Sequence, residues 1–170
     1  MNQFAQALLD ILRLRAGPED LPASWTLTLI FVGLHVAFGM FTAMALDQSS
    51  TVFNSLVMTA LQIFAVAILL KVRGFPERLA QTLLAFAGTG IIIGGIVFGV
   101  LLQADQDVNQ PLLALVWLPL FIWSLVVDAH IYRNALAISL SQAMLITVLL
   151  LAGSYVVVEL LVMFFTGNTG

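Results

Sequence analysis

The chain has 170 residues, of which 61% are hydrophobic and only 9% are charged, with a net charge of −3 at pH 7. Soluble domains carry about a quarter charged residues, and a small fold leaves much of its surface in contact with its solvent. The composition therefore excludes an ordinary water-soluble domain. The chain has no basic run, which argues against a nucleic-acid partner, and no cysteine, which excludes disulfides and thiolate chemistry.

The N-terminal segment predicts a short amphipathic helix followed by a break. Phe4, Leu8 and Ile11 fall on one helical face, and the proline-containing stretch Gly17–Pro22 ends the helix. We expect this helix to lie in the cytoplasmic interface of a bilayer, with Arg13 near anionic headgroups. Docking on the helix bundle or on a partner is the alternative, and the residues do not choose between them.

Five later stretches are long and apolar enough to cross a bilayer, which takes roughly 20 residues per helix. They run from Trp25 to Leu46, from Val52 to Leu70, from Leu79 to Leu102, from Pro111 to Tyr132 and from Ala135 to Phe165. Their continuous apolar character favours helices over a β-barrel. The last stretch is too short for two spans and a turn, so we expect one long, tilted helix. The prediction is an all-α membrane protein with an interfacial helix and linker in residues 1–22 and a five-span domain in residues 23–170.

Four short connections carry most of the polar residues between the spans. They are Asp47–Ser50, Lys71–Arg78, Gln103–Gln110 and Arg133–Asn134. In the second connection, Gly74 is typical of a helix C-terminus and Pro76 of the first turn of the next helix. The last connection predicts a very tight turn.

The positions of the basic residues predict the orientation of the bundle. With five spans, all of them fall on the side of the N-terminus: Arg13, Arg15, Lys71, Arg73, Arg78 and Arg133. The opposite loops hold Asp47, Asp105 and Asp107 and no Lys or Arg. Because positive residues mark the cytoplasmic face, we expect a cytoplasmic N-terminus and an external C-terminus. The small size and short loops favour the inner membrane of a bacterium.

Ionisable residues within the spans are the candidate functional groups, because they are costly in lipid. His35 lies near the middle of the first span. One interpretation is a proton-responsive or ligand-contacting group. The one we favour is a neutral imidazole that is hydrogen-bonded to a neighbouring helix. Asp128 and His130 lie near the cytoplasmic end of the fourth span, and Asp128 shares a helical face with Tyr132. They form a polar site or, as we favour, an interface anchor in which Asp128 pairs with an arginine. Glu159 lies near the outer end of the fifth span, so a stepped proton path through His35, Asp128 and Glu159 is conceivable if water fills the gaps.

The third span is rich in glycine and predicts close helix packing. The Gly90/Gly94 and Gly95/Gly99 pairs have the small-xxx-small spacing that lets two helices approach. The partner helix belongs to this chain or to another copy. We find no catalytic set and no metal-ligand spacing, so we expect no enzyme activity, no cofactor and no metal.

Two segments resemble bacterial Yip1-domain membrane proteins. They are Arg78–Gly88 and the stretch from Trp123–Leu125 to Ile131–Leu136. The five-span layout with a cytoplasmic N-terminus is also similar to that family. The resemblance implies no enzymatic activity, and the Asp-Leu-Tyr-Gly-Pro signature of the eukaryotic members is absent here.

These observations lead to two functional hypotheses. The first is a non-enzymatic interaction or scaffold protein of the bacterial inner membrane, whose partners are the lipid bilayer and a second copy or another membrane protein. The alternative is a small transporter or channel that uses His35 with Asp128 or Glu159. A membrane enzyme is a third class, which would need a buried polar cavity with converging ionisable groups.

Overall fold

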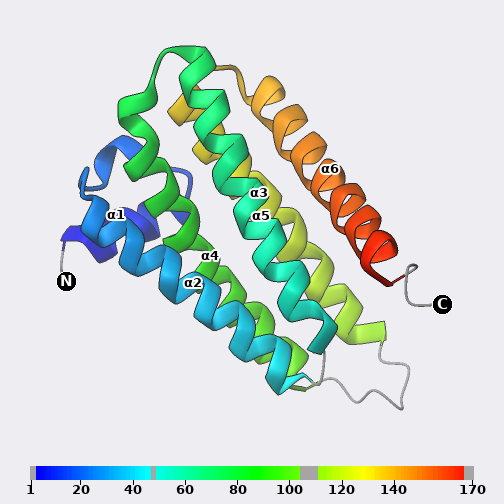
Figure 1. The fold of residues 1–170 in the computed structure, drawn as a ribbon. Coiled ribbons are helices and arrows are strands. Elements are labelled where there is room, and N and C mark those ends of the chain that lie inside the picture. The colour runs from blue at the N-terminus through cyan, green and yellow to red at the C-terminus, as the bar shows by residue number, and fades with distance from the viewer. Residues whose placement is uncertain (1–2, 47–48, 104–110, 167–170) are drawn as a thin grey trace.

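The structure is a computed structural model and describes residues 3–46, 49–103 and 111–166. Within these ranges the chain forms a bundle of helices and no strands (Figure 1). The helices are α1 (Gln3–Leu12), α2 (Trp25–Ala45), α3 (Ser49–Arg73), α4 (Leu79–Leu101), α5 (Pro111–Leu136) and α6 (Leu140–Thr166), with short 3-10 helices η1 (Pro18–Asp20) and η2 (Pro76–Arg78).

Five of the helices in the described ranges, α2 to α6, are long and apolar enough to cross a membrane. This confirms the expected all-helical, five-span composition. The final apolar stretch is one helix, as predicted. The predicted polar segments around residues 47–48 and 104–110, with Asp47, Asp105 and Asp107, lie outside the described residues, as do residues 167–170.

Helix α4 lies at the centre of the packing. It contacts α2 most extensively and also α1, α3 and α5, whereas α6 packs on α5 and α3 (Figure 1). In the most apolar stretch of α4, 39% of the residues are buried, against 11% in α2, α3 and α6. The outer helices therefore leave most of their surface for lipid, in which apolar side chains need no further cover.

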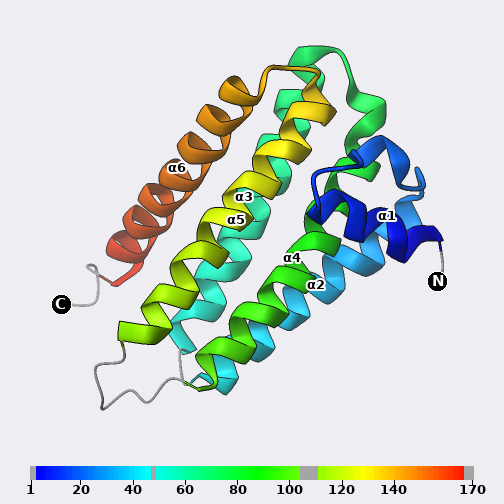
Figure 2. The same cartoon turned by 180° about the vertical axis from the view of Figure 1, so that it is seen from behind.

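The N-terminal segment docks on the bundle. Helix α1 packs on α4 and α5 (Figure 2), and Leu8 and Ile11 are buried. The ring of Phe4 also meets that of Phe31 on α2 at a centroid distance of 5.1 Å. A Cβ atom at Gly88 would lie 2.7 Å from Cδ2 of Leu8, so this glycine leaves the space that α1 fills. Docking of α1 does not exclude an interfacial position, which stays a prediction.

The turn between α3 and α4 follows its sequence signals. Gly74 has a φ of +79°, the left-handed conformation that ends a helix. The backbone N–H of Phe75 donates to the carbonyl of Leu70 at 2.8 Å, which closes the cap. Pro76 then opens η2, which leads directly into α4.

The predicted turn at Arg133–Asn134 is wrong. Both residues lie within α5, and the chain reverses three residues later, before α6 begins at Leu140. The reason is the capping box that starts α6: the backbone N–H of Ser139 donates to Oε1 of Gln142, and the N–H of Gln142 donates to Oγ of Ser139. This pair fixes the start of α6 and lets α5 run on to Leu136.

Candidate functional site

Polar side chains of α3 line a row of cavities inside the bundle. The polar residues Asn54, Ser55, Thr59 and Gln62, together with the apolar Met58, recur at helical spacing, so they share one face of α3. That face looks toward α2 on one side and toward α5 and α6 on the other. In a membrane, side chains of this kind are placed where they meet protein or water rather than lipid.

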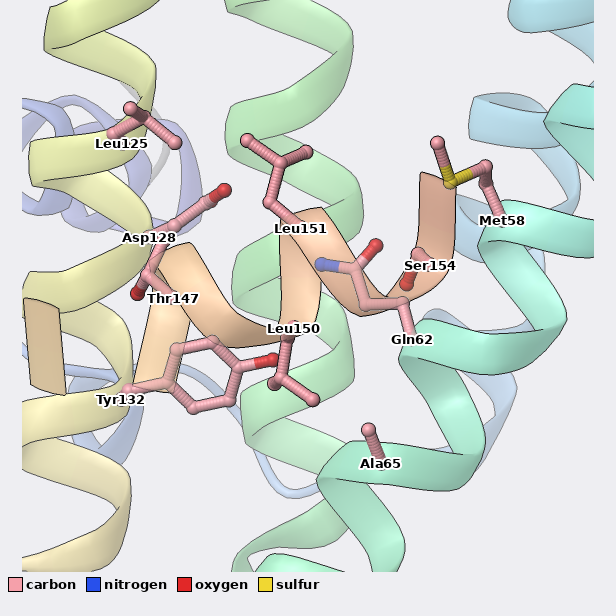
Figure 3. A pocket seen from close by; sticks show the side chains of 10 residues that line it. All are labelled: Met58, Gln62, Ala65, Leu125, Asp128, Tyr132, Thr147, Leu150, Leu151 and Ser154. Atoms are coloured by element: carbon pink, nitrogen blue, oxygen red, sulfur yellow. The ribbon is translucent and has the colours of Figure 1, made fainter. Parts of the chain in front are cut away.

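The first cavity lies between α3, α5 and α6 and has a volume of about 260 Å³. Its polar lining comes from five residues: Gln62, Asp128, Tyr132, Thr147 and Ser154. Leucines 125, 150 and 151 form much of the remaining wall. Figure 3 shows Asp128 and Tyr132 extending from α5 and Gln62 extending from α3 into the same space.

Asp128 has no hydrogen bond and no ion pair among the residues that the structure describes. It lies about two turns before the end of α5, roughly 12 Å along the helix axis. The arginines considered as its partners are used elsewhere. Arg73 donates to the carbonyl of Leu136, and Arg78 donates to the carbonyls of Asn134 and Ala135. These two side chains cap the C-terminus of α5, and the ion pair expected for Asp128 is not formed.

The second cavity lies between α2, α3 and α6, has a volume of about 470 Å³ and holds His35 and Asn54. The Nδ1 atom of His35 and the Oδ1 atom of Asn54 are buried and, within the described part of the chain, have no hydrogen-bond partner. Buried polar atoms are nearly always paired with protein or ordered water. Two such atoms in one cavity indicate that water or a polar ligand occupies it.

Gln62 lines all three cavities. They are the cavity of Asp128, the cavity of His35 and a third, smaller one of about 20 Å³ between α2, α3 and α4. His35 also lines this third cavity. The cavities of the two ionisable groups, which the sequence places at different depths, therefore share Gln62 in their walls.

Gly90 provides the space for His35. A Cβ atom at position 90 would lie 2.7 Å from Cε1 of the imidazole. The next glycine of the predicted packing face, Gly94, lies in the same way against Phe38, at 3.1 Å from Cε1. Gly95 and Gly99 have no side-chain or neighbouring-helix atom within 4 Å of a built Cβ. The two predicted glycine pairs thus differ: Gly90 and Gly94 pack on α2, and Gly95 and Gly99 face outward.

His130 belongs to a different environment from Asp128. It is buried, and its Nε2 lies 2.9 Å from the carbonyl oxygen of Ala16 and 3.1 Å from Nδ2 of Asn134. A carbonyl only accepts, so the bond to Ala16 forms with the proton on Nε2, whereas the amide nitrogen of Asn134 is a donor and bonds Nε2 only in the other tautomer. The residue fastens the N-terminal segment to α5 and lines none of the three cavities.

Glu159 and Arg133 are exposed on the outside of the bundle. The proton path considered through Glu159 has no support here, because that residue lines none of the cavities that hold His35 and Asp128. The described residues also contain no group of three His, Asp or Glu side chains that could hold a metal ion.

Sequence reasoning singled out His35 and Asp128 and gave no site role to Gln62, Thr147 and Ser154. The available signal was the polar spacing along α3, where Asn54, Thr59 and Gln62 interrupt an otherwise apolar helix. No protein-family model, curated protein or solved structure matches this chain.

Proposed function

We propose that this protein is a small membrane transporter or channel that admits a small polar solute to the cavities between α2, α3, α5 and α6. The observation that carries the proposal is the position of Gln62, which lines both the cavity of His35 and the cavity of Asp128. Keeping a carboxylate and an imidazole within the spans without partners is costly. A solute or water molecule that meets these groups accounts for their presence.

The test is flux across proteoliposomes that contain the full chain. Protons, potassium, methylammonium and urea are suitable probes, because they differ in charge and hydrogen bonding at small size. At least one probe should permeate faster than through protein-free liposomes, and the increase should fall at least tenfold in both His35→Ala and Asp128→Asn. Glu159→Gln is the matched control, since this carboxylate is exposed and lines no cavity, and it should leave the flux unchanged.

The proposal fails if wild-type proteoliposomes and protein-free liposomes are indistinguishable for all four probes. It also fails if the flux survives in the two cavity variants while circular dichroism shows both to be folded.

The proposed location is the inner membrane of a bacterium, with the N-terminus in the cytoplasm and α1 near that interface. Support comes from the basic residues of the α3–α4 turn, two of which bond the C-terminus of α5 and so share one end of the bundle with it.

Cysteine labelling tests this orientation. The chain has no cysteine, so in a single-cysteine variant only the introduced residue reacts with a maleimide. A membrane-impermeant maleimide should label Gln103→Cys from outside and Glu77→Cys only after lysis. Labelling of both from one side would contradict this orientation.

A second candidate function is a non-enzymatic scaffold that acts through helix packing. It is favoured by the open surroundings of Gly95 and Gly99 on α4, because small residues facing lipid let another helix approach. The partner would be a second copy or another membrane protein. Crosslinking in native membranes should then recover an oligomer that Gly95→Leu abolishes, and recovery of monomer alone would contradict it.

Membership of the Yip1-domain family likewise remains a proposal, supported by the segments at the start of α4 and the end of α5.

A further inference from the structure

The cavity of Asp128 has a charge that nothing nearby balances. Among the described residues, no Lys, Arg or His lines it, and Asp128 forms no ion pair. A carboxylate in the interior of a membrane protein is stabilised by a bound cation or by a proton. The lining therefore favours a ligand that brings one positive charge.

Two of the five polar residues that line the cavity, Asp128 and Thr147, can only accept a hydrogen bond from a ligand. The hydroxyl of Thr147 already donates to the carbonyl of Ala143 at 3.0 Å, so it can only accept from a ligand. The carboxylate of Asp128 accepts as well, and both side chains line the same cavity. A group with several N–H donors fits this pair better than a quaternary ammonium, which has none.

The rest of the wall is apolar, and the space is larger than a small ion needs. Leu125, Leu150 and Leu151 face the same cavity, and Asp128 is the one carboxylate among the described residues that line it, whereas a divalent metal is usually held by several charged oxygens. A cavity of about 150 Å³ is enough to hold benzene, and this one measures about 260 Å³. The volume matches an aromatic ring with a short alkyl chain.

From these features we infer that the cavity between α3, α5 and α6 binds a primary ammonium carried on an apolar body, with Asp128 as the counter-charge and Thr147 as a second acceptor. This inference rests on the proposed function in that it names the class of solute. The same chemistry is present in a soluble amine and in the headgroup of an ethanolamine lipid, so the experiment must separate the two sources.

The experiment is equilibrium binding of radiolabelled 2-phenylethylamine to the full chain in micelles of a neutral detergent. The amine should bind saturably and at least tenfold more tightly than its neutral analogue 2-phenylethanol or its anionic analogue 3-phenylpropionate. Asp128→Asn should weaken binding at least tenfold, and Thr147→Val about threefold. Glu159→Gln should bind like wild type, because its carboxylate is outside the cavity.

A repeat in nanodiscs distinguishes the sources of the ammonium group. If an ethanolamine lipid occupies the cavity, the amine should bind more weakly in phosphatidylethanolamine than in phosphatidylcholine, and Asp128→Asn should remove the difference. Equal binding in both lipids assigns the cavity to a soluble amine.

Binding of the amine and of the alcohol is compared in the wild-type chain, so this measurement tests the inference even if a variant does not fold. Binding of the amine no tighter than that of the alcohol overturns it, and so does unchanged binding by folded Asp128→Asn. If the amine binds but no probe permeates, the proposed binding site stands and the proposed transport function is wrong. Flux of other solutes without amine binding would retain transport and reject this ligand.

Discussion

The two halves of α4 have different surroundings. From Ala80 to Thr89 nearly every residue is buried, whereas from Gly90 to Leu101 none is. The first half is enclosed by α1 and η1 in addition to α2, α3 and α5. The second half packs on α2 through Gly90, Gly94 and Phe98, while Ile92 and Ile93 touch the edge of the core. The short N-terminal elements contribute to the difference, since Leu8 of α1 packs against Gly88 in the first half.

The polar groups around the two halves of α4 also differ, because those around the first half have hydrogen-bond partners. Around the first half, Thr28 bonds the carbonyl of Ala80, Gln81 bonds those of Glu19 and Leu21, and His130 bonds that of Ala16. Next to the start of the second half, His35 keeps a buried nitrogen without a described partner. Paired polar groups stabilise a fold, and unpaired ones weaken it unless a ligand binds. The comparison therefore separates an end of the bundle whose polar groups are paired from a middle in which buried polar atoms have no described partner.

The largest expected effect comes from releasing α1. Ile11 is fully buried between the N-terminal segment and the bundle, and Ile11→Ala should lower the free energy of unfolding by about 3 kcal/mol through lost contacts and a residual cavity. Unfolding by sodium dodecyl sulfate in mixed micelles measures this. Gln6→Ala, on the exposed side of the same helix, is the control. If both changes have the same small effect, the N-terminal elements do not stabilise the first half of α4.

Next in size is a comparison of two polar residues of α5, one that has a hydrogen-bond partner and one that has none. His130→Leu leaves the partly buried carbonyl of Ala16 without its side-chain partner and should cost about 2 kcal/mol. Asp128→Leu removes an unpaired carboxylate and should leave stability unchanged or raise it. Thermal unfolding in detergent, followed by tryptophan fluorescence, compares the two. A strong loss of stability in Asp128→Leu would show that this carboxylate has a structural partner.

A smaller effect is expected at the boundary between the two halves of α4. Gly90→Ala places a methyl group against the ring of His35 and should destabilise by about 1 kcal/mol through overpacking, or turn the ring away. Gly95→Ala meets no neighbour and should be neutral or slightly stabilising, since alanine is the better helix former. Equal melting temperatures for the two variants would argue that the second half is less closely packed at Gly90 than its contacts indicate.

How much of this could be predicted from the sequence depends on the kind of signal. The spans and the turn at Gly74 follow from apolar length and from local backbone chemistry, and both are confirmed. The Ser139/Gln142 capping box is equally local, and it was missed because the polar pair Arg133–Asn134 looked like the natural break. The shared wall of the cavities had no such signal. Because lipid and protein interior are both apolar, the apolar residues of a span do not mark the side that faces inward, so the place of Gln62 in the walls of both cavities needed the structure.

The smallest expected effect concerns one hydrogen bond between helices. The hydroxyl of Thr28 lies 2.9 Å from the carbonyl of Ala80 on α4 and 3.0 Å from that of Ser24 in its own chain segment. Thr28→Val keeps the shape and should cost about 0.6 kcal/mol, the typical value for such bonds in membranes. Thr42→Val is the matched change, because that hydroxyl bonds only the carbonyl of Gly39 among the described contacts, and it should be neutral. The difference between the two in unfolding free energy isolates the α2–α4 bond, and a larger loss at Thr42 would mean that helix contacts near the outer end contribute more than the enclosed half of α4.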